Sequence, residues 1–313
     1  MKIWKWVGIA AVMLFMVACA WAEEGNDQYP NGAENWYAGA VPPPGHYYVN
    51  YFGFYNGKLK DGSGANALLG GSTPTAFATF NASRGLVMTH LKLFGADYGM
   101  HMIVPVVYQS VDLGGSANRT NIGDIDVDPF VLAWHHPSWH AVAAFDTFLP
   151  TGYYDKNDAR ISIGTNHVGF EPLFGASWLP KSGWETSAKL MYDFNLTNQA
   201  TNYRSGQSFH ADYGAGKHIG PWMAGASGYV LKQTTDDSSA GQQVGAVPGL
   251  WDAGRRGQVL AIGPAVGYTS KNHVILMADW QHETLVRNRF GGDKMWFKLI
   301  IPMDGLFARA GAR

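Results

Sequence analysis

Hydrophobic and polar residues alternate along much of the chain with a period of two, the pattern of a β-strand with one buried and one solvated face. The clearest segment is Trp184–Leu196, in which aromatic, aliphatic and small residues share one face and charged or polar residues share the other. His273–Glu283 repeats the arrangement, with carboxylates on its polar face. Long strands of this kind are typical of the wall of a membrane β-barrel.

The same pattern predicts about twelve strands. Their approximate bounds are 46–56, 84–95, 97–111, 124–136, 139–149, 166–180, 183–197, 208–219, 221–234, 257–271, 273–286 and 292–302. Tight turns alternate with long polar loops, of which 57–83, 112–123 and 150–165 are examples. We therefore predict an all-β fold: a transmembrane antiparallel β-barrel with short periplasmic turns, long extracellular loops and both ends in the periplasm.

The positions of the tryptophans support this prediction, whereas several prolines inside predicted strands count against it. Trp134, Trp139, Trp178, Trp184 and Trp222 lie beside the tight turns, where they would form an aromatic girdle at the periplasmic rim; the alternative is the core of a soluble β-sandwich.

A closed barrel has no free strand edge where the missing N–H of a proline could be accommodated, so bulges are expected at the prolines inside predicted strands. These are Pro105, Pro129, Pro172 and Pro264.

The start of the chain has the form of a secretory signal peptide, with two lysines, an apolar stretch and the small-x-small sequence Ala20-Trp21-Ala22. Cys19, the only cysteine, lies inside it, and lipidation of Cys19 is an alternative to ordinary cleavage. We predict a signal peptide at 1–22, a periplasmic N-terminal segment at 23–45, the outer-membrane barrel at 46–302 and a C-terminal tail at 303–313.

Composition supports a membrane barrel. Charged residues make up 15% of the chain, against a usual ~25% in soluble proteins. Loss of the signal peptide removes two lysines and no acidic residue, so the formal net charge falls from −1 to −3 and no nucleic-acid surface is implied. The expected partners are outer-membrane lipid, the barrel-assembly machinery and a small hydrophobic or aromatic solute.

Several segments together resemble the phenol MetA degradation family, and the likeness covers nearly the whole chain beyond the signal peptide. They are Asn31–Gly45, Gly123-Asp124, Pro150–Tyr153, Tyr192–Asn195, Ser205–Tyr213, Ala261–Pro264 and Tyr268. The resemblance implies an outer-membrane barrel that imports aromatic or other hydrophobic compounds for catabolism. It implies no catalytic residue.

Six charged residues fall on the polar faces of predicted strands and would point into the barrel. They are Glu185, Lys189, Asp193, Asp279, Glu283 and Lys298. In one interpretation they line a water-filled or partly plugged path and select solutes. In the other they pair with one another and fill a narrow barrel. The two interpretations are compatible.

The segment 23–45 is not strand-like, because it ends in Val41-Pro-Pro-Pro-Gly45 and carries scattered polar residues. Two aromatic residues, Trp36 and Tyr37, make it a candidate plug that enters the barrel and gates the lumen. The alternative is a disordered periplasmic tether.

Two tracts suggest metal sites. Asp124, Asp126 and Asp128 share one face and could bind Ca²⁺, but they lack the glycine and the distant glutamate of an EF-hand, so a solvated or salt-bridged lumen face is favoured. The tract from His135 to His140 is interpreted as a periplasmic hairpin, because adjacent histidines on a strand point to opposite faces.

The sequence contains no G-x-S-x-G, H-E-x-x-H, P-loop or C-x-x-C motif. No catalytic residue, metal or cofactor is predicted, and the protein is not expected to be an enzyme. We predict a passive channel for small hydrophobic or aromatic solutes. The alternatives are a barrel that binds lipid or amphiphiles without transport, and an outer-membrane lipid hydrolase.

Overall fold

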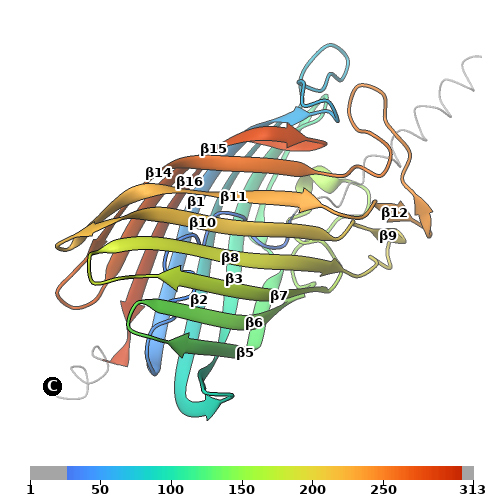
Figure 1. The fold of residues 1–313 in the computed structure, drawn as a ribbon. Helices are drawn as coiled ribbons and strands as arrows, with labels where there is room; N and C mark the ends of the chain where they lie inside the picture. Colours follow the sequence, from blue (N-terminus) through green and yellow to red (C-terminus); the bar gives the residue numbers. More distant parts are fainter. Residues whose placement is uncertain (1–26, 305–313) are drawn as a thin grey trace, which may run out of the picture.

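The computed structural model describes residues 27–304 and confirms the closed antiparallel β-barrel (Figure 1). Each long strand pairs with the next one along the chain, and the first strand closes the barrel against the last. The strands of the wall are β1 (Gly45–Lys60), β2 (Thr75–Leu93), β3 (Ala96–Asp112), β4 (Ser116–Ile122), β5 (Ile125–His135), β6 (Trp139–Leu149), β7 (Gly169–Trp178), β8 (Trp184–Asn195), β10 (Ser208–Ile219), β11 (Trp222–Gln233), β14 (Gln258–Thr269), β15 (Ile275–Arg287) and β16 (Arg289–Pro302).

The sheet has thirteen strands, but β4 and β5 both pair with β3, one beyond the other. They therefore act as one interrupted strand, and the wall has the predicted twelve positions. Strands also extend into 57–83 and 112–123, which the sequence predicts as loops. The alternating pattern fades there, and those segments are rich in Asn, Ser and Thr.

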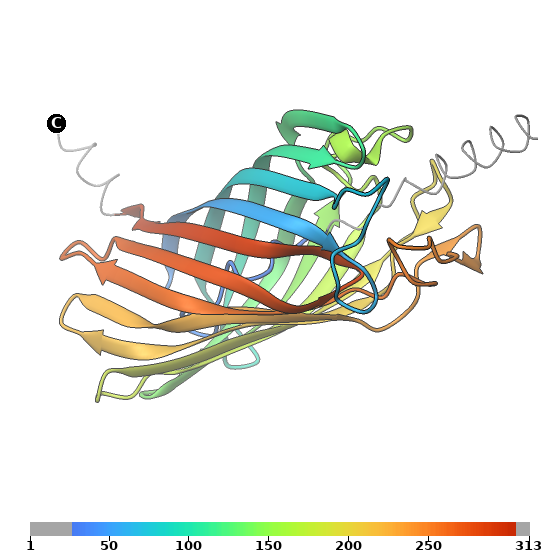
Figure 2. The same cartoon turned by 90° about the horizontal axis from the view of Figure 1, so that it is seen from above.

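Short turns gather at one end of the barrel, called the turn end here, and most of the longer connections gather at the other, the loop end (Figures 1 and 2). The loop end carries the 3₁₀ helix η1 (Ala159–Ile161) and a small sheet of β9 (Tyr203–Arg204), β12 (Ser238–Ser239) and β13 (Gln242–Gln243). Burial raises the pKa of the Asp237 carboxyl beside this sheet, and hydrogen bonds from the Tyr203 hydroxyl and the Gly206 N–H act in the opposite direction.

The prolines lie where the hydrogen-bonded ladders are interrupted. A register shift confirms the expected bulge at Pro129, and the Asp128 carboxylate accepts hydrogen bonds from the N–H groups of Phe130 and Phe145 there. Pro172 and Pro264 lie at gaps in a ladder without a change of register, so no bulge forms at these positions. At each of these gaps, two residues of each strand are left out of the ladder, but the strand pairing continues in the same register on both sides.

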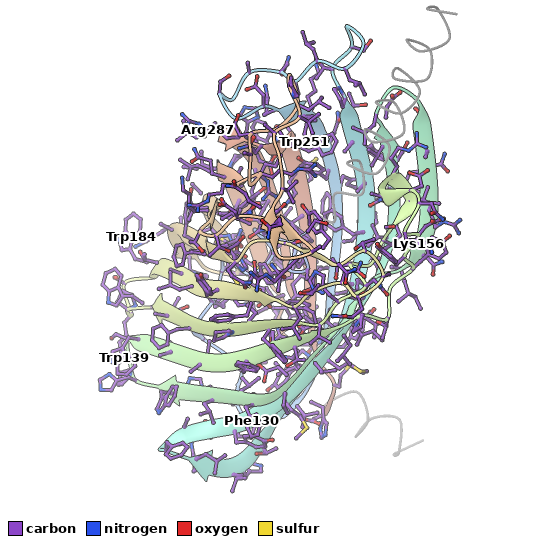
Figure 3. The ribbon with its side chains drawn as sticks, turned by 90° about the vertical axis from the view of Figure 1, so that its right-hand side faces the viewer. Phe130, Trp139, Lys156, Trp184, Trp251 and Arg287 are labelled. Atoms are coloured by element: carbon purple, nitrogen blue, oxygen red, sulfur yellow. The ribbon has the colours of Figure 1, made fainter. Side chains whose placement is uncertain are left out.

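The outer surface of the barrel is apolar, as a lipid-facing wall requires. Four of the five tryptophans of the predicted girdle are exposed and lie beside the short turns, namely Trp139, Trp178, Trp184 and Trp222. Figure 3 shows Trp139 and Trp184 pointing outward from the wall. Trp139 and Trp178 are direct cross-strand partners. Among residues 27–304, no helix is long and apolar enough to cross a membrane.

Residues 27–44, called the inner segment from here on, run through the lumen before β1 begins. Asp27 lies at the loop end, where it pairs with Arg289, and Gly39 lies near the turn end beside Ser177. The described part of the predicted segment 23–45 therefore enters β1 from inside the barrel. Residues 1–22 and 305–313 of the predicted signal peptide and tail lie outside the described residues.

The apolar outer wall predicts that a charge in the middle of a strand is costly. Leu190 is exposed on the outside near the centre of β8, so Leu190→Arg should lower the free energy of unfolding by ~2–4 kcal/mol. The matched change Ile219→Arg, at the turn end of β10, should cost only ~0–1 kcal/mol. Urea unfolding in lipid vesicles measures both, and equal losses would contradict the assigned membrane position.

Candidate functional site

The inner segment is bound to the lumen wall by carboxylates of the barrel. Asp212 on β10 accepts hydrogen bonds from the Tyr29 hydroxyl (2.6 Å), the Gly32 N–H (2.7 Å) and the Glu34 N–H (3.0 Å). The segment has no helix or sheet of its own, so its N–H groups need such partners. Asp212 is fully buried, and its two oxygens receive three donors from one loop.

A second group of anchors holds the segment closer to the turn end. Asp279 accepts hydrogen bonds from the Trp36 indole (3.1 Å) and the Asn35 amide (3.3 Å). Glu185 accepts one from the Tyr37 N–H (2.7 Å), and the Tyr37 ring lies 5.7 Å from the ring of His218. Trp36 and Tyr37 therefore lie inside the barrel and contact its wall.

Glycines on two neighbouring strands make room for the Trp36 ring. A side chain at Gly216 or Gly225 would come within 2.8 Å of the indole. The wall is locally flat at this position, so an aromatic ring of the inner segment can rest directly on the sheet.

Glu34 is the centre of the buried charge cluster in the lumen. Its carboxylate pairs with Arg84 from β2 and with Lys189 from β8 at 2.9 Å, and the Tyr51 hydroxyl donates to it at 2.5 Å. Arg84 in turn contacts the Nδ1 atom of His101 at 2.9 Å. One acidic side chain of the inner segment thus neutralises cations from two strands of the wall.

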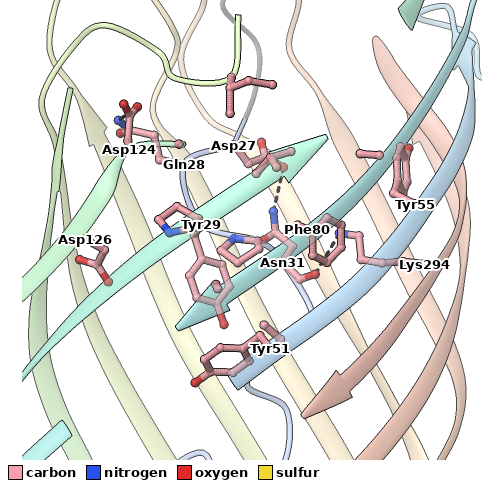
Figure 4. Close-up of a pocket in the computed structure, with 18 of the residues that line it drawn as sticks. Asp27, Gln28, Tyr29, Asn31, Tyr51, Tyr55, Phe80, Asp124, Asp126 and Lys294 are labelled. Carbon is pink, nitrogen blue, oxygen red and sulfur yellow. Dashed lines mark hydrogen bonds between the residues drawn. The ribbon is translucent and has the colours of Figure 1, made fainter. Parts of the chain in front are cut away.

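Two cavities lie on either side of this cluster. The larger, about 310 Å³, is on the loop-end side, and Figure 4 shows the side chains that surround it. The smaller, about 100 Å³, is on the turn-end side and is lined by aliphatic residues that include Val131, Val142 and Leu173. Side chains of the charge cluster line both cavities, namely Glu34, Tyr51, His101 and Lys189. The cluster therefore separates the cavities.

The structure places the six predicted lumen residues inside the barrel, but it gives them different neighbours. Glu185, Lys189 and Asp279 bind the inner segment directly. The ammonium of Lys298 lies 5.6 Å from the centre of the Tyr51 ring. Glu283 accepts hydrogen bonds from the Tyr55 and Tyr229 hydroxyls, and Asp193 contacts His210.

The two tracts that were considered as metal sites have separate structural roles. Asp124 accepts a hydrogen bond from Thr165 at the loop end, whereas the Asp128 carboxylate holds the bulge in β5. His135 and His140 are cross-strand partners with their Nδ1 atoms 3.0 Å apart. The hairpin interpretation of this tract is confirmed by the hydrogen bond from the His136 N–H to the Trp139 carbonyl.

Sequence analysis missed Glu34, Arg84 and Asp212 as site residues. Glu34 is the only charged residue between Gln28 and Pro44, and a lone charge in an aromatic segment could have indicated a buried partner. Asp212 lies on the polar face of β10 and could have been included with the other lumen residues. Nothing in the sequence indicates that Arg84 pairs with Glu34, because the two residues are 50 positions apart.

The chain is similar to known proteins in sequence and in structure. The family model described as "Putative MetA-pathway of phenol degradation" matches residues 57–299. The COG4313 outer membrane channel from Pseudomonas putida F1 is similar in structure, with 12% identity, 84% of this chain and 97% of that chain covered, and a TM-score of 0.69. The translocator domain of the autotransporter NalP from Neisseria meningitidis shares 10% identity over 83% of this chain and 89% of its own, with a TM-score of 0.48. No curated protein sequence matches the chain.

The Glu34 cluster predicts a measurable stability effect. Glu34→Gln leaves Arg84 and Lys189 without their shared carboxylate, and breaking a buried ion pair costs ~3–5 kcal/mol. Urea unfolding in vesicles should show a loss of about this size. Asp158→Asn, which removes a half-exposed pair with Arg160 at the loop end, is the control and should have little effect. Equal effects of the two changes would mean that the cluster does not hold the segment.

Proposed function

Because this chain belongs to the family "Putative MetA-pathway of phenol degradation", we propose that it is a channel of the bacterial outer membrane for passive uptake of small hydrophobic or aromatic compounds that feed catabolism. The inner segment is the gate of this channel. The membrane location is supported by the closed barrel, its apolar outer wall and the tryptophan girdle.

One observation carries the proposal: two cavities lie in line inside the barrel and are separated by the side chains around Glu34. A solute that enters the larger cavity from the loop end reaches the smaller cavity only if this cluster moves. The inner segment is held by hydrogen bonds and ion pairs, so it can shift without breaking the barrel. Movement of Glu34 away from Lys189 would join the two cavities.

The chemistry of the larger cavity favours a small apolar solute. Phe80, Ile103, Val107 and Trp296 are among the residues that line it, together with charged residues near the inner segment. A cavity of ~150 Å³ with apolar walls is enough to hold benzene, and this one measures about 310 Å³. A substituted ring therefore fits, with its polar group directed toward the charged side.

The gate predicts a change in conductance. Deletion of residues 28–44 should produce a larger and steadier single-channel conductance in planar bilayers, because the lumen then fills with water. Glu34→Ala should give intermediate behaviour with more frequent openings. Lys271→Gln, in an exposed turn, is the control and should behave like the natural protein. Unchanged conductance after the deletion would refute the gate.

The solute class is tested by uptake at low concentration. Cells that lack the protein should take up labelled phenol or toluate more slowly than cells that carry it, and the intact gene should restore the rate. Equal rates would remove the aromatic solute from the proposal. Saturable binding of an amphiphile without flux into liposomes would then favour a lipid-binding barrel, and product release from phospholipid vesicles would favour a hydrolase.

A further inference from the structure

Three ionisable side chains from adjacent strands converge on the lumen wall away from the Glu34 cluster. They are Glu171 on β7, Asp193 on β8 and His210 on β10. The Nε2 atom of His210 lies 3.2 Å from Glu171 Oε2 and 3.2 Å from Asp193 Oδ1. One ligand atom from each residue lies within 4.8 Å of the other two, and Glu171 and His210 are fully buried.

Glu171 has few polar contacts for a buried carboxylate. Among the described residues its close charged partner is the Nε2 atom of His210 at 3.2 Å. Neither Glu171 oxygen accepts a well-directed hydrogen bond, and the Nδ1 atom of His210 is also buried without one. The single Nε2 position of His210 already contacts Asp193. An ionised carboxylate in such surroundings is costly unless a cation compensates it. The cluster therefore has acceptor atoms in excess and room for a positive charge.

We propose that Glu171, Asp193 and His210 bind a divalent transition-metal cation of the Zn²⁺ class. Imidazole nitrogen and carboxylate oxygen are ordinary zinc ligands at ~2.0–2.2 Å, so two ligands in a tetrahedral arrangement lie roughly 3.4 Å apart. The two 3.2 Å separations at His210 are close to this value. Three protein ligands leave the fourth position open to water or a solute group.

A second cluster of a histidine and two carboxylates in the same lumen already has positively charged side chains beside it. His101 lies 3.3 Å from both Asp126 and Asp146, but Arg84 contacts its Nδ1 atom and Lys189 lies 3.9 Å from Asp146. Protein cations already supply the positive charge there. The Glu171 cluster has no arginine or lysine at ion-pair distance among its described contacts. The charge of Lys189 reaches Glu171, but its ammonium pairs with Glu34 at 2.9 Å and with Asp146 at 3.9 Å.

An access route leads to the proposed metal site. Asp193 lines a cavity of about 50 Å³ at the loop end, beside Gln28 and Ser205, and the Ser205 hydroxyl in this cavity is buried without a partner. The Tyr29 ring of the inner segment lies 5.3 Å from the His210 ring and covers the other side. A cation can thus enter from the loop end while the inner segment stays in place.

Zinc titration of the purified full-length mature protein in detergent tests the proposal. His135→Asn/His140→Asn serves as the background, because this half-exposed histidine pair at the turn end can also bind metal. The background protein should bind one Zn²⁺ per chain by calorimetry. Glu171→Gln and His210→Asn should each weaken binding by at least ~10-fold, whereas the matched control His101→Asn should not.

A cobalt spectrum gives a readout that needs no variant at the site. Co²⁺ added to the background protein should produce visible absorption bands of a nitrogen- and oxygen-ligated ion, and excess Zn²⁺ should remove them. The gel shift of folded against heated barrel identifies any variant that fails to fold. Absence of zinc binding, binding that survives both Glu171→Gln and His210→Asn, or loss in His101→Asn alone would each overturn the proposal.

Discussion

The structure depends on the neutralisation of charges that the barrel wall turns inward. Arg84 and Lys189 project from different strands into the lumen, where both are largely buried, and Glu34 supplies the carboxylate that pairs with both. Asp212, Asp279 and Glu185 need donors in turn, and the backbone and indole of the same segment supply them. The wall and the inner segment therefore satisfy each other's buried polar groups.

The same mutual satisfaction of polar groups underlies the proposal that the inner segment is a gate. A gate must be held firmly enough to close the path and weakly enough to move. Hydrogen bonds and ion pairs have this property, because water can replace the partners one at a time. The apolar contacts of the segment are few by comparison: Tyr29, Ala33 and Trp36 each join a different cluster of the wall.

Much of the wall could be predicted from the sequence, because a lipid-facing and a lumen-facing side impose strict alternation. Trp184–Leu196 shows this most clearly, and β8 begins within one residue and ends within two residues of the predicted bounds 183–197. The end of β1 and the start of β2 were missed, because the alternation there is carried by small residues such as Ala76, Ala78 and Ala82 and gives a weak hydrophobic signal. The candidate site was predicted only in part: Lys189 and Asp279 follow from alternation, whereas their binding to Glu34 and Trp36 depends on the path of a segment without periodicity.

The central claim is that solutes pass only when the inner segment moves relative to the wall. Ala33 and Ala82 pack in one cluster between the inner segment and β2, and Cys19 is the only cysteine of the sequence. Ala33→Cys/Ala82→Cys would allow the two to be joined by a disulfide or a short crosslinker. Flux of a labelled aromatic compound into liposomes should stop when the link is formed and return when it is reduced. Equal flux in the linked and reduced protein would contradict the account.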